Sequence, residues 1–183
     1  MASLTDRMLR AVQLDANLYE EVEADTGAMG QATVVVILSS LAGGIGTAAQ
    51  GGIRGLIGGA FASLIGWYIW AFLTYYIGTK WLPEPTTEAD TGQMLRTLGF
   101  ASAPGIVRIV GIIPGLGLLA LVVAPIWTLC AMVVAVRQAL DYTSTGRAIA
   151  VCLIGFVVQI AVIAILLVAF GLVAASQPGP PVA

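Results

Sequence analysis

The side chains that could carry out chemistry are few in this sequence, and they are widely spaced. The 183 residues include no histidine, and none of the ten Asp and Glu residues lies in a long apolar stretch. A nucleophile needs a base within reach, so the serines of the apolar stretches are expected to hydrogen-bond to the backbone or to neighbouring helices. Cys130 and Cys152 lack metal-ligand spacing and are expected to be small buried hydrophobes. We therefore predict a protein that is not an enzyme and that binds no metal or cofactor.

Two polar side chains inside apolar stretches are candidates for function. Arg108 is the sole charge between residues 97 and 136, and Gln159 lies near the middle of the last apolar stretch. Ionisable residues within membrane segments often mark functional sites. With no carboxylate nearby, the pair would serve an anion or a lipid headgroup in a small transporter, channel or lipid-handling protein. The preferred interpretation is simpler: Arg108 lies about 7.5 Å of α-helix from the outer end of its segment, so its long side chain can anchor to outer headgroups.

The composition requires a membrane. Hydrophobic residues make up 58% of the chain and charged residues 10%, with a mean hydropathy of +0.95. Soluble domains carry about 25% charged residues. The net charge of -2 and the lack of a basic stripe exclude a nucleic-acid partner, whereas membrane lipids are expected partners.

Five apolar segments predict an all-α, polytopic bundle of five transmembrane helices. The apolar run between Arg96 and Gln138 is too long for one crossing, which takes about 20 residues, and its Pro-Gly-Leu-Gly step at 114–117 predicts a tight turn. The predicted segments are residues 29–49, 53–81, 94–113, 116–136 and 148–173. Residues 1–28 precede this membrane domain (29–175), and residues 176–183 form a tail that is expected to be disordered.

The second segment has a small-residue stripe at one end and an aromatic girdle at the other. The stripe repeats every four residues and consists of Gly51, Gly55, Gly59 and Ser63. Such stripes let membrane helices approach closely; we favour packing on the small half of the first segment over a dimer face, and self-association remains a secondary expectation. The girdle, typical of a headgroup level, comprises Trp67, Tyr68, Trp70, Tyr75, Tyr76 and Trp81.

Residues 1–28 are acidic and amphipathic. Apolar side chains from Ser3 to Val22 follow a rough helical spacing, which predicts one helix capped by Ser3 or Thr5. Surface-seeking helices are usually basic, so we expect this acidic one to dock on the protein's own cytoplasmic face or on a partner. A loosely ordered, solvated lead-in is the alternative.

The positive-inside rule sets the orientation. With five crossings, one side holds six of the eight basic residues: Arg7, Arg10, Lys80, Arg96, Arg137 and Arg147. Cytoplasmic loops carry the excess of Lys and Arg, which predicts a cytoplasmic N-terminus and an external C-terminus. A four-crossing model with residues 96–113 re-entrant would put both termini inside, leaving a cytoplasmic tail without charge. The short loops and Ala/Gly-rich helices favour a bacterial cytoplasmic (inner) membrane.

Three stretches resemble the Yip (Ypt/Rab-interacting protein) domain family, in particular its bacterial members. They are LYEEVEADTGAMGQA at 18–32, LGFASAPG at 98–105 and WTLCAMVVAVRQALDYTSTGRAIAV at 127–151. The resemblance implies a multispanning membrane protein, and eukaryotic members bind prenylated Rab-type GTPases in membrane traffic. This chain carries neither the long cytoplasmic N-terminal region nor the DLYGP-like motif of those members. For bacterial relatives it implies a fold more than an activity.

These observations lead to one functional hypothesis. We expect a non-enzymatic membrane scaffold or adaptor in membrane organisation or trafficking, with a protein partner bound at an acidic cytoplasmic face. The residues predicted to bind it are Tyr19, Glu20, Glu21, Glu23, Asp141 and Arg147.

Overall fold

The computed structural model describes residues 2–46 and 52–169, and every regular element in these ranges is helical. The long apolar elements are α3 (Met29–Gly46), α4 (Gly52–Tyr76) with its π-helical end η2 (Ile77–Trp81), α5 (Thr91–Phe100) continued by the 3₁₀ helix η3 (Ala103–Ile112), α6 (Gly117–Ala139) and α7 (Thr145–Ala169). Before them come α1 (Leu4–Val12), α2 (Ala16–Ala24) and η1 (Thr26–Ala28). Within the described ranges, five stretches are long and apolar enough to cross a membrane, which confirms the predicted all-helical fold.

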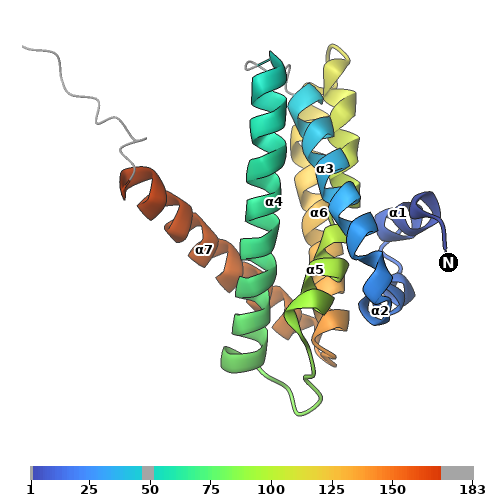
Figure 1. The fold of residues 1–183 in the computed structure, drawn as a ribbon, viewed down its shortest axis with the longest axis vertical. Helices are drawn as coiled ribbons and strands as arrows, with labels where there is room; N and C mark the ends of the chain where they lie inside the picture. Colours follow the sequence, from blue (N-terminus) through green and yellow to red (C-terminus); the bar gives the residue numbers. More distant parts are fainter. Residues whose placement is uncertain (1, 47–51, 170–183) are drawn as a thin grey trace, which may run out of the picture.

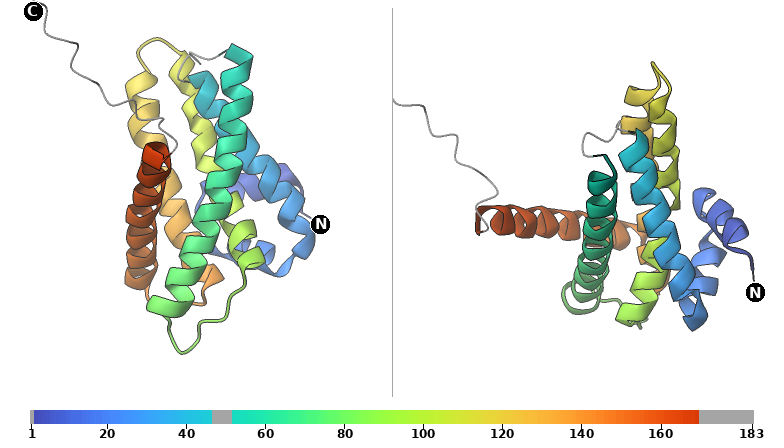
Figure 2. Two further views of the ribbon diagram at one scale, coloured as in Figure 1. Left: turned by 60° about the vertical axis from the view of Figure 1, so that its left-hand side comes forward. Right: turned by 45° about the horizontal axis from the view of Figure 1, so that its top comes forward.

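α3, α4, α6 and the α5–η3 pair stand side by side, with α1 and α2 packed on their flank (Figure 1). α7 starts against α6 and η2 and then runs away from the other long helices at a steep angle (Figure 2). Large apolar side chains of its outer half stay exposed, among them Val157 at 66% and Ile165 at 66%. The sequence predicted five helices in one bundle; the structure has four columns with α7 leaning out of them.

The predicted turn at 114–117 is present. The Leu116 amide donates to the Ile113 carbonyl at 3.0 Å, with Pro114 and Gly115 between them. Gly115 has φ 90°, which suits the third position of a type II turn and strains any residue with a Cβ. The turn makes η3 and α6 antiparallel neighbours.

The third segment begins with a capped helix and changes its helix type in the middle. Asp90 caps α5 through a capping box with Gln93. The helix then changes to 3₁₀ geometry just before Pro104, which has no N–H to continue the α-helical ladder. A 3₁₀ helix rises about 2.0 Å per residue, so Arg108 lies about 10 Å, rather than about 7.5 Å, from the outer end.

The N-terminal segment is two helices rather than one. Ser3 caps α1 by accepting from the Asp6 amide, as predicted, but α1 ends at Val12 and Asp15 caps α2. Between them Leu14 has φ 61°, a left-handed conformation that reverses the chain. The reversal lets both helices bury apolar side chains in the protein's own core, including Ala11, Leu18 and Val22, so the segment docks on its own bundle.

The predicted packing of the small-residue stripe on the first membrane helix is wrong for Gly55 and Gly59. Both are exposed, and a Cβ at either position would meet no atom within 4 Å. Ser63 of the stripe does contact α3, because its hydroxyl donates to Ser40 at 2.9 Å, and Leu56 packs over Gly44. A dimer face at the two glycines remains a prediction.

Two members of the predicted aromatic girdle are core residues. Trp67 and Trp70 are each 6% exposed, and the Trp67 indole donates to the Leu95 carbonyl at 3.0 Å. Tyr68 and Trp81 remain on the surface. Gly51, the ends of two predicted segments (residues 47–49 and 170–173) and the predicted disordered tail lie outside the described residues.

Candidate functional site

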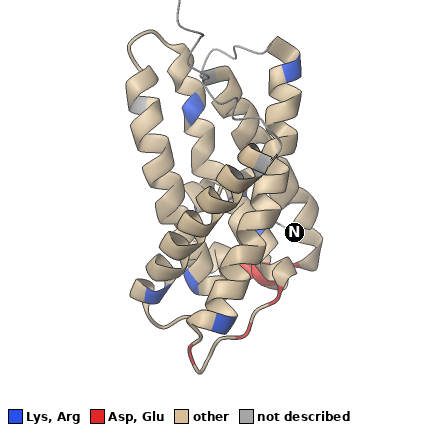
Figure 3. Ribbon diagram, turned by 90° about the vertical axis from the view of Figure 1, so that its left-hand side faces the viewer, with Lys and Arg blue, Asp and Glu red and all other residues tan. Residues whose placement is uncertain are grey.

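The polar side chains that are candidates for function lie in two places: the end of the bundle where α2 docks, and a cavity among the membrane helices. Acidic residues gather at the first of these, around α2 and the loop between η2 and α5 (Figure 3). The cavity holds few charged groups. We describe the docked segment first, because it positions the acidic residues.

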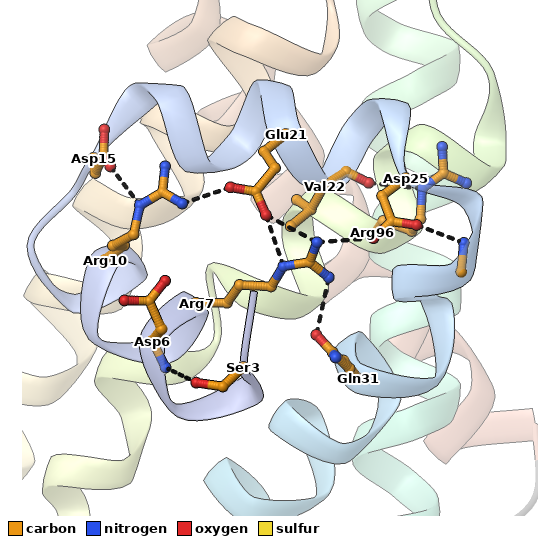
Figure 4. A network of polar contacts seen from close by, with 11 residues as sticks. Ser3, Asp6, Arg7, Arg10, Asp15, Glu21, Val22, Asp25, Gln31 and Arg96 are labelled. Atoms are coloured by element: carbon orange, nitrogen blue, oxygen red, sulfur yellow. Dashed lines mark hydrogen bonds and ion pairs between the residues drawn. The ribbon is translucent and has the colours of Figure 1, made fainter. Parts of the chain in front are cut away.

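Arg7 is the centre of the docked segment (Figure 4). Arg7 is only 3% exposed. Its guanidinium donates to Glu21 at 2.9 Å, to Asp25 at 2.8 Å and to Gln31 of α3 at 3.0 Å. Arg10 pairs with Asp15 at 2.8 Å and with Glu21 at 2.5 Å. The arginine hydrogen bonds hold the pKa of Glu21 below its usual range. Glu21, predicted to bind a partner, is thus engaged inside the protein.

Two residues of the membrane helices cap the N-terminal helices. The buried Arg96 of α5 donates to the Val22 carbonyl at 2.9 Å and also to the Glu23 carbonyl, at the end of α2. The Trp127 indole of α6 donates to the Val12 carbonyl at 2.8 Å, at the end of α1. The last carbonyls of a helix lack intrahelical partners, and a cation there also complements the helix dipole. The N-terminal helices are therefore fixed to the bundle at both of their C-terminal ends.

Three of the predicted partner-binding acids converge at this end of the bundle. Glu20 and Asp141 are exposed, Glu23 is partly buried, and Glu20 accepts from Gln138 of α6 at 2.7 Å. Burial raises the pKa of Glu23 to about 7, aided by the nearby carboxylates of Asp141 and Glu20 and opposed by Arg96. Burial, with Glu20 and Glu88, also raises the pKa of Asp141. We call Glu20, Glu23, Glu88, Asp90 and Asp141 the acidic face.

The loop that supplies Glu88 and Asp90 is tied to the loop between α6 and α7. Thr86 donates to the Asp141 carbonyl at 2.8 Å, and the Thr143 amide and hydroxyl donate to Glu84 at 2.8 and 2.7 Å. Arg147 donates to the Pro83 carbonyl at 2.6 Å and lies 3.5 Å from Glu84. Arg147, predicted to contact a partner, thus fastens two loops and is still exposed. These contacts hold together the two loops that carry Glu88, Asp90 and Asp141.

Tyr19, also predicted to bind a partner, is fully buried. It lies in the core with Leu18 and Val22, and its hydroxyl has no hydrogen-bond partner among the described residues. Burial raises the pKa of this phenol above its usual range. In this structure its side chain packs α2 on the bundle and does not face outward.

Arg108 and Gln159, 51 residues apart in the sequence, line one cavity of about 590 Å³. The Arg108 Nε donates to the Gly105 carbonyl at 3.1 Å, and Gln159 Nε2 lies 3.5 Å from the Gly66 carbonyl. We call this space the inter-helix cavity; its polar lining includes Ser39, Ser63, Ser102, Arg108, Thr128 and Gln159. Arg108 therefore turns into the bundle, and residues of the third and fifth membrane helices line the same cavity.

The comparison with protein families settles what kind of protein this is. A family model described as the Yip1 domain matches residues 17–175. The chain belongs to the Yip1 domain family. Yip proteins form a non-enzymatic family of membrane proteins that interact with Rab/Ypt proteins. Neither the comparison with curated proteins nor that with solved structures found a match.

The Yip1 match includes α2 and the five candidate crossings but not α1. The resemblance found from the sequence is thereby confirmed. The sequence did not indicate the capping roles of Arg96 and Trp127, because each partner carbonyl lies more than 70 residues away. It also did not indicate that Trp70 and Thr128 would line the same cavity as Arg108. Hydropathy identifies an apolar helix but does not show which of its faces lines a cavity.

Proposed function

We propose that this Yip1-family protein is a non-enzymatic membrane scaffold or adaptor, and that it binds a basic partner at the acidic face. The proposal rests chiefly on one observation: carboxylates from α2, from the loop before α5 and from the loop after α6 gather at one end of the bundle. After burial, the neighbouring acids are the next cause that raises the pKa of Glu23 and of Asp141. Like charges held together in the free protein repel one another. A basic surface that docks there relieves the repulsion, and complementary charge also speeds association.

The chemistry of the membrane part agrees with a binding protein. All ten carboxylates lie outside the apolar cores of the crossings, and the chain has no histidine. Among the described residues, no group of three or more His, Cys, Asp or Glu could hold a metal ion. The rigid fastening of the two loops means that little order needs to be gained on binding, which favours affinity.

Charge reversal tests the proposal. Membranes that contain the triple variant Glu20→Lys, Glu23→Lys, Asp141→Lys are crosslinked, solubilised in mild detergent and analysed by mass spectrometry beside the wild type. We expect partners crosslinked to the wild type to be lost at least tenfold from the variant. Asp6→Lys is the matched control, because Asp6 is an exposed acid of α1 outside the acidic face, and it should keep them. Recovery of the same partners with the triple variant, or of none with the wild type, would refute the proposal.

A further inference from the structure

Two buried polar groups in the wall of the inter-helix cavity have no hydrogen-bond partner in the part of the chain that the structure describes. They are the Trp70 indole Nε1 and the Thr128 hydroxyl, whose residues are 6% and 9% exposed. An indole N–H is a donor only, and leaving a buried donor unpaired is costly. Trp70 lies in α4 and Thr128 in α6, and both residues line the same cavity. A ligand with acceptor oxygens would satisfy both groups.

The third feature of this wall is the guanidinium of Arg108. In the described residues it has no Asp or Glu within ion-pair distance, although its Nε uses the Gly105 carbonyl. Glycine neighbours make room for it: a Cβ on Gly43 would lie 3.2 Å from Nη1, and one on Gly105 would lie 2.6 Å from Nη2. A guanidinium carries five donors and binds phosphate strongly in a low-dielectric site. The cavity thus has one cationic point for an anion.

The mouth of the cavity is apolar. Ile126 and Leu129 of α6 and Leu153 and Phe156 of α7 line it, and they are 59%, 44%, 56% and 55% exposed. Beyond its start, α7 leans away from the other long helices (Figure 2). In a membrane protein this opening faces hydrocarbon. A small water-soluble anion would have to cross that apolar mouth, whereas a lipid can bring its headgroup in and leave an acyl chain outside.

We propose that the inter-helix cavity binds one anionic glycerophospholipid. The phosphate accepts hydrogen bonds from Arg108, ester oxygens of the same molecule supply acceptors for Trp70 and Thr128, and an acyl chain leaves between α6 and α7 over Leu153 and Phe156. A volume of about 590 Å³ suits a headgroup and the start of its chains. The site is separate from the acidic face, and the proposal does not depend on it.

Native mass spectrometry of the purified full chain tests this site. Protein in a non-ionic detergent is titrated with phosphatidylglycerol, with zwitterionic phosphatidylcholine, and with inorganic phosphate. We expect one phosphatidylglycerol to bind several-fold more tightly than phosphatidylcholine. Arg108→Gln should weaken this binding about tenfold, through loss of a charge-assisted contact. Thr128→Val, which keeps the shape and removes the hydroxyl, should weaken it about threefold.

Arg54→Gln is the matched control, because Arg54 is an exposed arginine of α4 that does not line the cavity. It should bind phosphatidylglycerol as the wild type does. If Arg108→Gln does not fold, Thr128→Val and Trp70→Phe still report on the cavity with the charge in place. If all variants bind phosphatidylglycerol equally well, the lipid binds only around the outside of the protein, and the proposal is overturned. Tight binding of inorganic phosphate without lipid would also overturn it, as would a lipid-free dimer whose cavity is filled by the partner's helix.

Discussion

At the scale of single residues, Tyr19 makes a sharp prediction. Its side chain is completely buried and its hydroxyl has no partner among the described residues. An unsatisfied buried hydroxyl costs about 1–3 kcal/mol, so Tyr19→Phe should raise the free energy of unfolding by about 1 kcal/mol. Thermal unfolding in detergent micelles measures this change. A drop in stability, or loss of the crosslinked partner, would mean that the hydroxyl makes a contact that the structure does not show.

Glu23 predicts a pH dependence with a definite sign. Burial raises the pKa of its carboxyl from 4.5 to about 7, so the folded state binds the proton more tightly than the unfolded state. Its contribution to stability is therefore fully present below about pH 4.5 and is lost as the pH rises through 7. The pKa values of Asp15, Glu21 and Asp25 are lowered instead, and those contributions are lost only in more acidic solution. Between pH 5 and pH 8, unfolding should become easier.

The Glu23→Gln variant isolates this effect. A shift of this size is worth at most about 3 kcal/mol, and solvent contact of the partly buried carboxyl reduces it. The variant should lose more than half of the change in melting temperature between pH 5 and pH 8; the remainder comes from Asp141, whose pKa is also raised. Asp6→Asn, at an exposed position of α1 outside the acidic face, is the control and should keep the slope. A wild-type protein whose stability rises from pH 5 to pH 8 would contradict the assignment.

At the scale of elements, the docking of α1 and α2 depends on Arg7 more than on Arg10. The Arg7 side chain is 4% exposed and the Arg10 side chain 25%. Removing one partner of a buried ion pair leaves the other charges unpaired, at a cost of about 2 kcal/mol or more, whereas exposed pairs are worth about 0.5 kcal/mol. Arg7→Ala should speed amide hydrogen exchange in residues 4–24 about thirtyfold, and Arg10→Ala about twofold. Equal protection in the two variants would show that apolar burial alone holds the segment.

Hydropathy located the long elements well and their partners poorly. The predicted segments at 29, 53, 94, 116 and 148 begin within about three residues of α3 to α7, because about 20 apolar residues in a row permit little else. The reversal at Leu14 and the change of helix type near Pro104 are set by tertiary contacts. Tertiary contacts also decide the positions of Trp67 and Trp70, which the sequence assigned to the membrane interface. The Trp67 indole donates to Leu95 of α5, and Trp70 lines the inter-helix cavity.

The candidate site was predicted in part. Acids were expected at one end of the bundle, and their convergence could be inferred from topology. The sequence could not show which of these acids stay free to bind a partner, because that depends on which groups accept hydrogen bonds from Arg7, Arg10 and Arg96. Arg108 was assigned to outer headgroups from its distance to the helix end; its turn toward Gly43 and Gly105 depends on a cradle that two glycines form only after α3 and η3 pack.

At the scale of the whole molecule, the two polar regions divide the protein into an acidic end and a cavity within the membrane zone. The acidic face combines α2 with two fastened loops, and α7 connects the regions, since Arg147 ties its start to the loop while Gln159 lines the cavity further along. Beyond Gln159, α7 packs against few other residues, as its exposed apolar side chains show. A change in the tilt of α7 would therefore alter the mouth of the cavity without disturbing the docked segment.

The fifth crossing by α7 is the step on which the topology depends. The positive-inside rule predicts that the side of the N-terminus, with its six basic residues, is cytoplasmic. A crossing by α7 would then put the C-terminus outside. α7 stands at a steep angle to α4 (Figure 2), but its window Thr145–Val162 is long and apolar enough to cross. A reporter that is active only in the cytoplasm should be silent when fused after residue 183 and active when inserted in the loop at residues 86–87. Activity at both positions would mean that α7 does not cross, and activity only at the C-terminus would mean that the whole orientation is reversed.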